Sequence, residues 1–112
     1  GAAGARALLA GPDRPDAAFC VTDLIACGFM DAARHEFGLS VPDELSVIGF
    51  DDIEQASWLS YRLTSFSPPV EELAAAVVDL ATMGEAAAED APSSRFLEAS
   101  LVWRDTVREN GA

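Results

Sequence analysis

The stretch that decides the fold runs from residue 41 to residue 53 and reads VPDELSVIGFDDI. A turn led by proline is followed by an apolar run at residues 45–50 with β-branched side chains at its centre, which is typical of a parallel strand covered on both faces. The run ends in Asp51 and Asp52, so two carboxylates directly follow a buried strand. This pattern predicts an open α/β sheet, in which ligands bind beyond the carboxyl ends of the strands.

A second strand is predicted upstream, at residues 15–21, ahead of a helix at residues 23–37 that stops at Gly38. Thr22 and Asp23 lie between them and are candidates for the helix N-cap, because each carries a side-chain oxygen that can accept from free backbone N–H groups. Strand, helix and strand with short links form a βαβ unit, whose crossover is right-handed in nearly all proteins.

The remaining patterns continue the alternation of helices and strands. The other predicted elements are a helix end at residues 2–10, a short strand at 63–66, a helix at 70–83, a polar loop at 85–95 and a strand at 96–103. Pro69 stands near the first position of the helix at 70–83, and two acidic residues in the first turn complement the helix dipole. The predicted class is therefore α/β with a parallel sheet.

The charge of the chain argues against two classes of function. The net charge is −12, and the seven basic residues are all arginine. Nucleic-acid binding needs a basic surface that displaces counterions from phosphates, so we expect any contact with DNA to be made by another part of a longer protein. A phospho-receiver domain also places carboxylates at strand ends, but it uses a lysine to bind phosphoryl oxygens, and this sequence has no lysine.

Catalytic, metal and membrane patterns are not found either. Ser65 and Ser67 do not stand in a Gly-x-Ser-x-Gly setting, and the single histidine, His35, is expected on a polar helix face. Cys20 and Cys27 lack the spacing of metal ligands and are expected to be buried and reduced, as in a cytoplasmic protein. No apolar run approaches the roughly 20 residues that span a bilayer. We predict neither an enzyme nor a bound cofactor or metal.

Polar side chains at two strand ends are the candidate binding residues. Thr22 and Asp23 follow the first strand, and Asp51 follows the second. If these strands are neighbours, all three side chains lie at one edge of the sheet, where a carboxylate can accept from two hydroxyls or from a ring N–H. A purely structural role stays open for Asp23 and Asp52, since each could simply cap a helix.

A surplus of apolar side chains predicts an interface. Several residues do not belong to the expected core stripe of their helix or loop: Leu24, Cys27, Met30, Trp58 and Leu59. A cluster of this kind that includes a tryptophan usually marks a protein–protein contact, although part of it could be ordinary core. Gly28 would allow a partner helix to approach closely.

Four segments resemble the LacI/GalR family of transcriptional repressors. Residues 15–28 resemble the family pattern PDAxFCxNDxxAxG, and residues 41–53 match VPxDxSVxGFDD almost residue for residue. Residues 63–73 are similar to LTTVxQPxxELG, and residues 97–106 to LxxxLVxRxST. The order and spacing of the four patterns make this resemblance specific.

The resemblance implies a Rossmann-like, periplasmic-binding-protein-like fold with two α/β subdomains and an effector between them. We expect an incomplete fragment of it. Residues 1–66 would be part of the C-terminal effector subdomain, residues 67–69 a crossover, and residues 70–112 a helix and strand of the N-terminal subdomain with the return crossover. Family members bind DNA through an N-terminal helix-turn-helix domain, which has no counterpart in this sequence.

The resemblance also implies roles for single residues. Asp51 matches the aspartate that binds effector hydroxyls or a corepressor base, and Thr22 stands where most members have an effector-binding asparagine. Pro68 replaces a common glutamine beside the pocket, and the loss of this polar group argues against a standard sugar. The effector that the resemblance implies is a sugar or a nucleobase-like molecule. The apolar cluster, apart from Met30, falls on the family's face for homodimer formation. An alternative interpretation is the solute-binding protein of a sugar transporter, which shares the fold.

Overall fold

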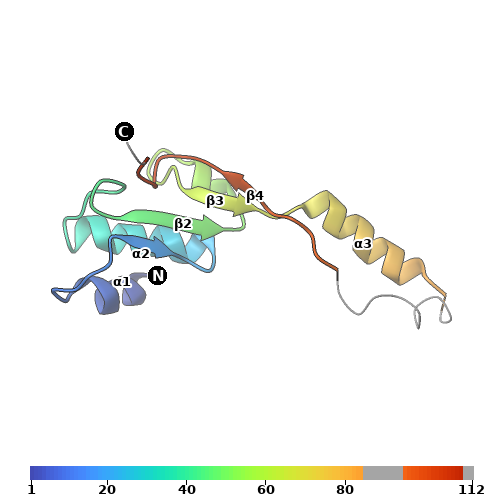
Figure 1. The fold of residues 1–112 in the computed structure, drawn as a ribbon, viewed down its shortest axis with the longest axis horizontal. Coiled ribbons are helices and arrows are strands. Elements are labelled where there is room, and N and C mark those ends of the chain that lie inside the picture. Colours follow the sequence, from blue (N-terminus) through green and yellow to red (C-terminus); the bar gives the residue numbers. More distant parts are fainter. Residues whose placement is uncertain (85–94, 110–112) are drawn as a thin grey trace.

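A computed structural model describes residues 1–84 and 95–109 (Figure 1). Its elements are α1 (Ala2–Leu9), β1 (Ala17–Phe19), α2 (Asp23–His35), β2 (Ser46–Phe50), the 3-10 helix η1 (Glu54–Ser57), β3 (Thr64–Ser67), α3 (Val70–Thr82) and β4 (Ser100–Val102). The predicted helices and strands are all found, within a few residues of their expected ends. The last strand is shorter than predicted, and the polar loop expected at 85–95 lies almost entirely outside the described residues.

The strands form one sheet in the order β1-β2-β3-β4. The first three strands are parallel, and β4 runs antiparallel to β3. Phe19 pairs with Ile48, and Phe50 pairs with Phe66, so β1, β2 and β3 end near the same edge of the sheet. The α/β prediction is confirmed.

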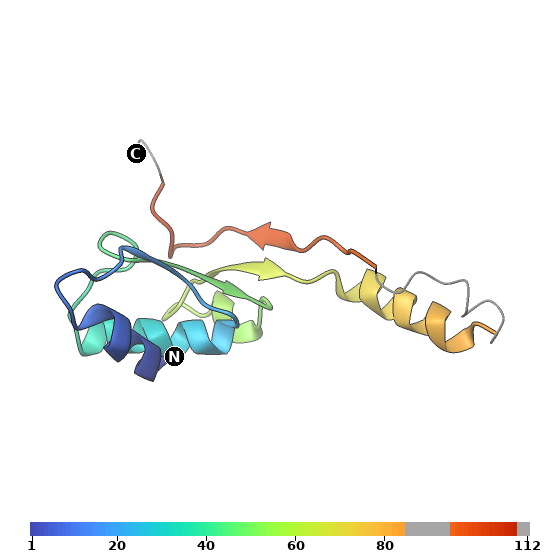
Figure 2. The ribbon, with the colours of Figure 1, turned by 60° about the horizontal axis from the view of Figure 1, so that its bottom comes forward.

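Helices cover one face of this sheet. Figure 2 shows α1, α2 and η1 together beneath the strands. The core between the two layers is built from large apolar side chains that are essentially inaccessible to solvent: Leu9, Met30, Leu45, Val47 and Leu63. Side chains alternate along a strand, so the neighbours of Val47 in β2 point to the other face. From α2, the core also includes Ala26, Phe29 and Ala33, which recur at helical spacing.

The opposite face of the sheet is only partly covered. Phe66 stacks on Phe50, with ring centroids 6.2 Å apart, and lies tilted against Phe19 at 6.4 Å. Phe19 keeps 61% of its surface exposed. The expectation that β2 is covered on both faces is therefore wrong for the described part of the chain, because no helix packs against this second face (Figure 2).

The end of the described chain returns to the sheet and ties two strands together. The backbone N–H of Val47 donates to the carbonyl oxygen of Thr106 at 2.8 Å, and the hydroxyl of Thr106 donates to the carbonyl oxygen of Val47 at 2.6 Å. The same hydroxyl accepts from the backbone N–H of Thr64 at 2.9 Å. Thr106 is fully buried and joins β2 to β3 just before the first pair of that ladder. We call residues 104–109 the return strap.

Helix α3 projects away from the rest of the molecule (Figure 1). With α3 included, the molecule measures 58 × 27 × 26 Å along its principal axes. Its apolar side chains are largely exposed: Val70, Leu73, Val77, Val78 and Leu80. The return strap packs on the sheet built from residues 17–67, whereas α3 stands apart from it. The assignment of α3 and β4 to a second subdomain stays a prediction. None of the described helices has the length and apolar character needed to cross a membrane.

Candidate ligand-binding site

Thr22 and Asp51 lie at the same edge of the sheet, where β1 and β2 end side by side. Thr22 is the N-cap of α2, and its hydroxyl oxygen accepts from the backbone N–H of Ile25 at 3.3 Å. A hydroxyl has one donor and two acceptor positions, so the cap leaves Thr22 able to bind a further group. The carboxylate-bearing residue Asp51 is exposed. Position and exposure therefore allow both side chains to contact one small molecule.

The backbone that carries Asp51 has an unusual conformation. Asp51 has φ +114° and Asp52 has φ +53°, a region that residues with a side chain rarely adopt. Each such residue costs about 1–3 kcal/mol and persists where the surrounding structure enforces it. Here the N–H of Asp51 donates to the carbonyl oxygen of Phe66 at 3.0 Å, which extends the β2–β3 pairing by one residue. The turn thereby holds Asp51 at the edge of the sheet.

Asp23 is buried beneath this turn and is not available to a ligand, which corrects the sequence prediction. Its carboxylate is fully inaccessible to solvent and both of its oxygens are occupied. Oδ1 accepts from the hydroxyl of Ser65 at 2.6 Å, and Oδ2 accepts from the backbone N–H of Ile53 at 3.0 Å. A buried carboxylate needs such partners, because an unpaired one is strongly disfavoured away from water. Asp23 thus links α2 to β3 and to the segment after the turn.

Gly49 makes room for this carboxylate. A Cβ atom at position 49 would collide with Oδ1 of Asp23. Gly49 pairs with Ser65 on the neighbouring strand, so the position without a side chain and the serine that binds Asp23 stand side by side. Sequence reasoning considered Ser65 only as a nucleophile and missed this role. A glycine in the middle of an apolar strand was the available signal, since it often marks a close approach.

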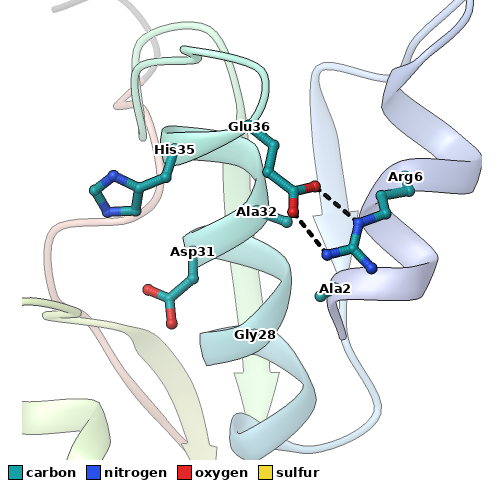
Figure 3. Close-up of a pocket in the computed structure, with 7 residues that line it drawn as sticks. All are labelled: Ala2, Arg6, Gly28, Asp31, Ala32, His35 and Glu36. Carbon is teal, nitrogen blue, oxygen red and sulfur yellow. Dashed lines mark hydrogen bonds and ion pairs between the residues drawn. The ribbon is translucent and has the colours of Figure 1, made fainter.

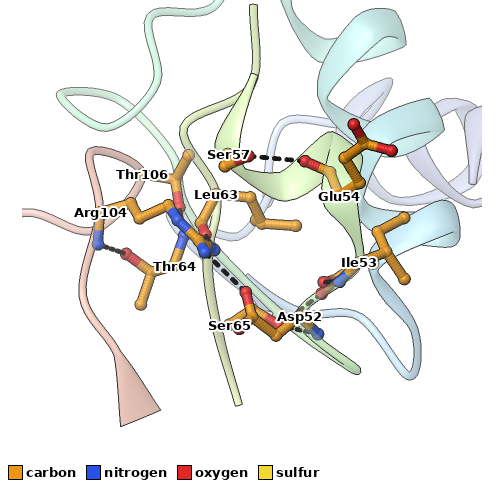
Figure 4. Close-up of polar contacts among 10 residues, drawn as sticks. Asp52, Ile53, Glu54, Ser57, Leu63, Thr64, Ser65, Arg104 and Thr106 are labelled. Carbon is orange, nitrogen blue, oxygen red and sulfur yellow. Dashed lines mark hydrogen bonds and ion pairs between the residues drawn. The ribbon is translucent and has the colours of Figure 1, made fainter. Parts of the chain in front are cut away.

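Arg104 is a second residue that sequence reasoning missed. Its guanidinium donates through Nη2 to Oδ1 of Asp52 at 2.6 Å and through Nη1 to the carbonyl oxygen of Leu63 at 2.7 Å (Figure 4). Its backbone N–H donates to the hydroxyl of Thr64 at 3.0 Å. Asp52 is therefore held by an ion pair with the return strap and does not cap a helix. Asp52 and Arg104 are 52 residues apart in the sequence, so no local pattern indicates the pair.

The predicted interface residues divide into two groups. Leu24, Trp58 and Leu59 are exposed, with 68%, 49% and 92% of their surface accessible. Met30 and Cys27 are buried, with 0% and 7% accessible. Met30 belongs to the core and offers no surface to a partner, which corrects its assignment; Cys27 offers very little. Of the predicted interface residues, only Leu24, Trp58 and Leu59 therefore offer an apolar surface to a partner.

The neighbour of Gly28 belongs to the same chain and lies at ordinary van der Waals distance. The atoms nearest to a Cβ built at Gly28 are the backbone nitrogen of Ala2 at 3.4 Å and the Cα of Gly1 at 3.5 Å. The helix that packs against Gly28 is therefore α1, and the expected partner helix is replaced by the chain's own first helix.

A hollow of about 550 Å³ opens between α1 and α2 (Figure 3). It is lined by Ala2, Arg6, Gly28, Asp31, Ala32, His35 and Glu36. Arg6 donates to both carboxylate oxygens of Glu36, at 2.6 and 2.8 Å, and these hydrogen bonds lower the pKa of the Glu36 carboxyl. Arg6 and Glu36 thus satisfy each other at the end of α2 that lies away from the strand ends, and Asp31 accepts from the hydroxyl of Tyr61 at 3.1 Å. Within residues 1–84 and 95–109, no three potential ligands gather as a metal site.

Comparisons with known proteins identify the family to which this fold belongs. The profile of the family described as "Periplasmic binding protein-like domain" matches residues 1–107. The chain belongs to this family. Within the periplasmic binding protein-like domains, it corresponds to part of the effector-binding region of LacI-family transcriptional regulators, as the following relatives indicate.

Curated relatives of this periplasmic binding protein-like domain are repressors. The chain is 34% identical to the ribose operon repressor of Haemophilus influenzae over 107 residues, which is 96% of this chain and 32% of that protein. It is 47% identical to the probable HTH-type transcriptional repressor ExuR of Bacillus subtilis over 66 residues, 59% of this chain and 20% of that protein. The chain thus spans a third or less of these relatives. They are transcription regulators and not enzymes.

Solved structures of LacI-family regulators have the same fold as this chain. The Lac repressor bound to ONPG in the repressed state superimposes with a TM-score of 0.79 at 29% identity, covering 94% of this chain and 31% of that one. A LacI transcriptional regulator from a Rhodococcus species gives a TM-score of 0.74 at 29% identity, covering 95% of this chain and 38% of that one. The family resemblance of the four sequence patterns is therefore confirmed.

Proposed function

We propose that this chain contributes one side of a small-molecule effector site and a homodimer surface to a cytoplasmic LacI-type transcriptional repressor. The observation that carries the proposal is the placement of Asp51 and Thr22 together at the carboxyl ends of adjacent parallel strands. This is where open α/β sheets bind their ligands. The similarity to repressors over nearly the whole chain supports the regulatory role.

The effector in this proposal is a sugar or a nucleobase-like molecule. Asp51 would accept hydrogen bonds from ligand hydroxyls or from a ring N–H, and Thr22 would contribute its hydroxyl. A hydrogen bond to a charged group contributes about 1.5–3 kcal/mol. Solved relatives with bound sucrose and glucose, and the ribose operon repressors, favour a carbohydrate.

DNA would be bound by another part of the parent protein, because a net charge of −12 opposes contact with phosphates. Effector binding would favour one of two arrangements of the dimer and thereby change the affinity for DNA, through differential binding to the two states. Leu24, Trp58 and Leu59 would form the dimer surface of this half. The repressors among the relatives favour this function over the solute-binding protein of a sugar transporter.

The proposal is tested by calorimetry on the full-length protein that carries this chain. The protein is titrated with D-ribose, D-glucose, sucrose and adenine, and the titration is repeated with Asp51→Asn. Asparagine has nearly the same shape as aspartate, so we expect the turn at position 51 to be kept. We expect a loss of affinity of about tenfold or more, from the lost charge on a ligand hydrogen bond.

Asp13→Asn is the matched control, because Asp13 is an exposed residue in the loop between α1 and β1. It should bind the same ligand with unchanged affinity. If Asp51→Asn binds as tightly as the parent, Asp51 does not belong to the site and this proposal fails.

A further inference from the structure

The segment 51–53 is supported from below by buried groups of other elements. The backbone N–H of Asp52 donates to the hydroxyl of Ser65 at 3.2 Å, and that of Ile53 donates to the carboxylate of Asp23 at 3.0 Å. Ser65 and Asp23 are fully buried and hydrogen-bonded to each other. Segment 51–53 is therefore held by two buried polar side chains, one from α2 and one from β3.

From the side, the same segment is held by the return strap (Figure 4). Arg104 pairs with the carboxylate of Asp52, and the two side chains are only 13% and 22% exposed. Two further hydrogen bonds fasten Arg104 to Leu63 and Thr64, at the start of β3. A guanidinium fixed at several points holds its carboxylate partner in one place. Removing the Arg104 guanidinium would leave the Asp52 carboxylate partly buried and without this cationic partner.

We propose that Arg104 is a positioning residue for ligand binding. It holds the side chain of Asp52 and thereby keeps residues 51 and 52 in the left-handed conformation that presents the Asp51 carboxylate at the sheet edge. The inference rests on the proposed role of Asp51 as a ligand contact. It adds that the return strap, a segment distant in sequence, sets the geometry of that contact.

The first test measures the turn without any ligand. Hydrogen–deuterium exchange is followed by NMR on the full-length protein and on Arg104→Met. We expect the amides of residues 51–53 to exchange about tenfold faster in the variant, a local opening, while the amide of Cys20 in the β1–β2 ladder keeps its rate. Unchanged exchange at 51–53 would overturn the inference.

Arg62→Met is the matched control. Arg62 pairs with Asp105 of the same strap at 3.1 Å, but this pair is exposed and does not touch segment 51–53. The control should therefore leave the exchange of the 51–53 amides at the parent rate. Equal acceleration by both variants would show that a general loosening of the strap is responsible, and would also overturn the inference.

The second test is a double-mutant cycle in the calorimetric titration with D-ribose, D-glucose, sucrose and adenine. Arg104→Met should weaken binding by about tenfold when Asp51 is present, because the carboxylate is misplaced. In the Asp51→Asn background the additional loss should shrink to within about twofold, because both changes act on one contact. Equal losses in the two backgrounds would show that Arg104 does not act through Asp51.

The two proposals fail in different ways. If Asp51→Asn leaves binding intact, the proposed ligand contact is wrong, while the exchange rates still decide whether Arg104 holds the turn. If Asp51→Asn weakens binding but Arg104→Met changes neither exchange nor affinity, the ligand contact stands and the positioning role is rejected. Arg104→Lys keeps the charge without the forked geometry and should restore only part of the protection.

Discussion

The thiol of Cys27 illustrates how burial controls chemistry at a single residue. Burial raises its pKa to about 11, and the nearby charges of Asp23 and Asp31 act in the same direction. Burial also raises the pKa of the other thiol, Cys20. Because the thiolate is the reactive form, both cysteines should be inert in the folded protein, as the sequence predicts for buried and reduced thiols.

We therefore predict that Cys27 in a Cys20→Ala variant reacts with iodoacetamide at pH 8 about a hundredfold more slowly in the folded protein than in urea. Mass spectrometry of timed samples measures the two rates. Since folding favours the neutral thiol, this group leaves the free energy of unfolding unchanged below about pH 9 and lowers it as the pH rises towards 11. Equal labelling rates with and without urea would contradict the burial of this thiol.

At the candidate site, the sequence predicted positions better than roles. Thr22 and Asp51 could be placed at one edge because strand ends are visible as the last apolar residues of their runs. The role of Asp23 could not be predicted, because its carboxylate is occupied by Ser65 from a strand far along the chain. The link between Arg104 and Asp52 depends on the same kind of distant contact.

The strands and helices depend differently on their glycines. Gly49 in β2 leaves the space that the Asp23 carboxylate occupies, whereas a Cβ at Gly28 in α2 would make ordinary contacts with Gly1 and Ala2. Substitution by alanine should therefore destabilise β2 and be tolerated in α2.

We predict that Gly49→Ala lowers the free energy of unfolding by about 1–3 kcal/mol, because the new methyl group overpacks a filled site. Gly28→Ala should instead be neutral or raise it by up to about 1 kcal/mol, because alanine favours the helix. Urea denaturation of the two variants provides the comparison. A stable Gly49→Ala protein would mean that the Asp23 carboxylate lies elsewhere.

The elements themselves were predicted well where the local pattern is strong. The helix at residues 23–37 and the strand at 45–50 were placed by their apolar periodicity and by the residues that end them, Thr22 and Gly38 among them. The final strand was predicted too long, because β4 pairs only where β3 lies beside it, from Ser100 to Val102. The extent of a pairing is fixed by the neighbouring strand and not by the apolar residues alone.

At the scale of the whole molecule, the exposed residues Leu24, Trp58 and Leu59 allow a test of the homodimer. Leu24 lies in the first turn of α2, and the other two follow η1, which packs against α2. We predict that Leu59→Glu weakens dimerisation of the full-length protein by about tenfold or more, because a charge is placed in an apolar contact. Sedimentation velocity over a range of concentrations measures this.

Leu8→Glu is the control, since Leu8 is an exposed leucine of α1 and not part of the proposed surface. It should leave the association constant unchanged. If Leu59→Glu associates as the parent does, the dimer surface lies elsewhere. The buried position of Met30 already shows why composition alone could not define this surface: an apolar residue serves core or contact according to what covers it, and Met30 lies in the core between α2 and the sheet.

The pairing of Ser67 with Ser100 has a consequence for how such a chain can be built. The backbone leaves the sheet at one of these serines and re-enters it at the other, directly opposite on an antiparallel ladder. Everything between them is, in topological terms, an insertion into a hairpin, which a short turn could also close. The part of the molecule that carries segment 51–53 can therefore accept inserted segments of different length and sequence between these two serines.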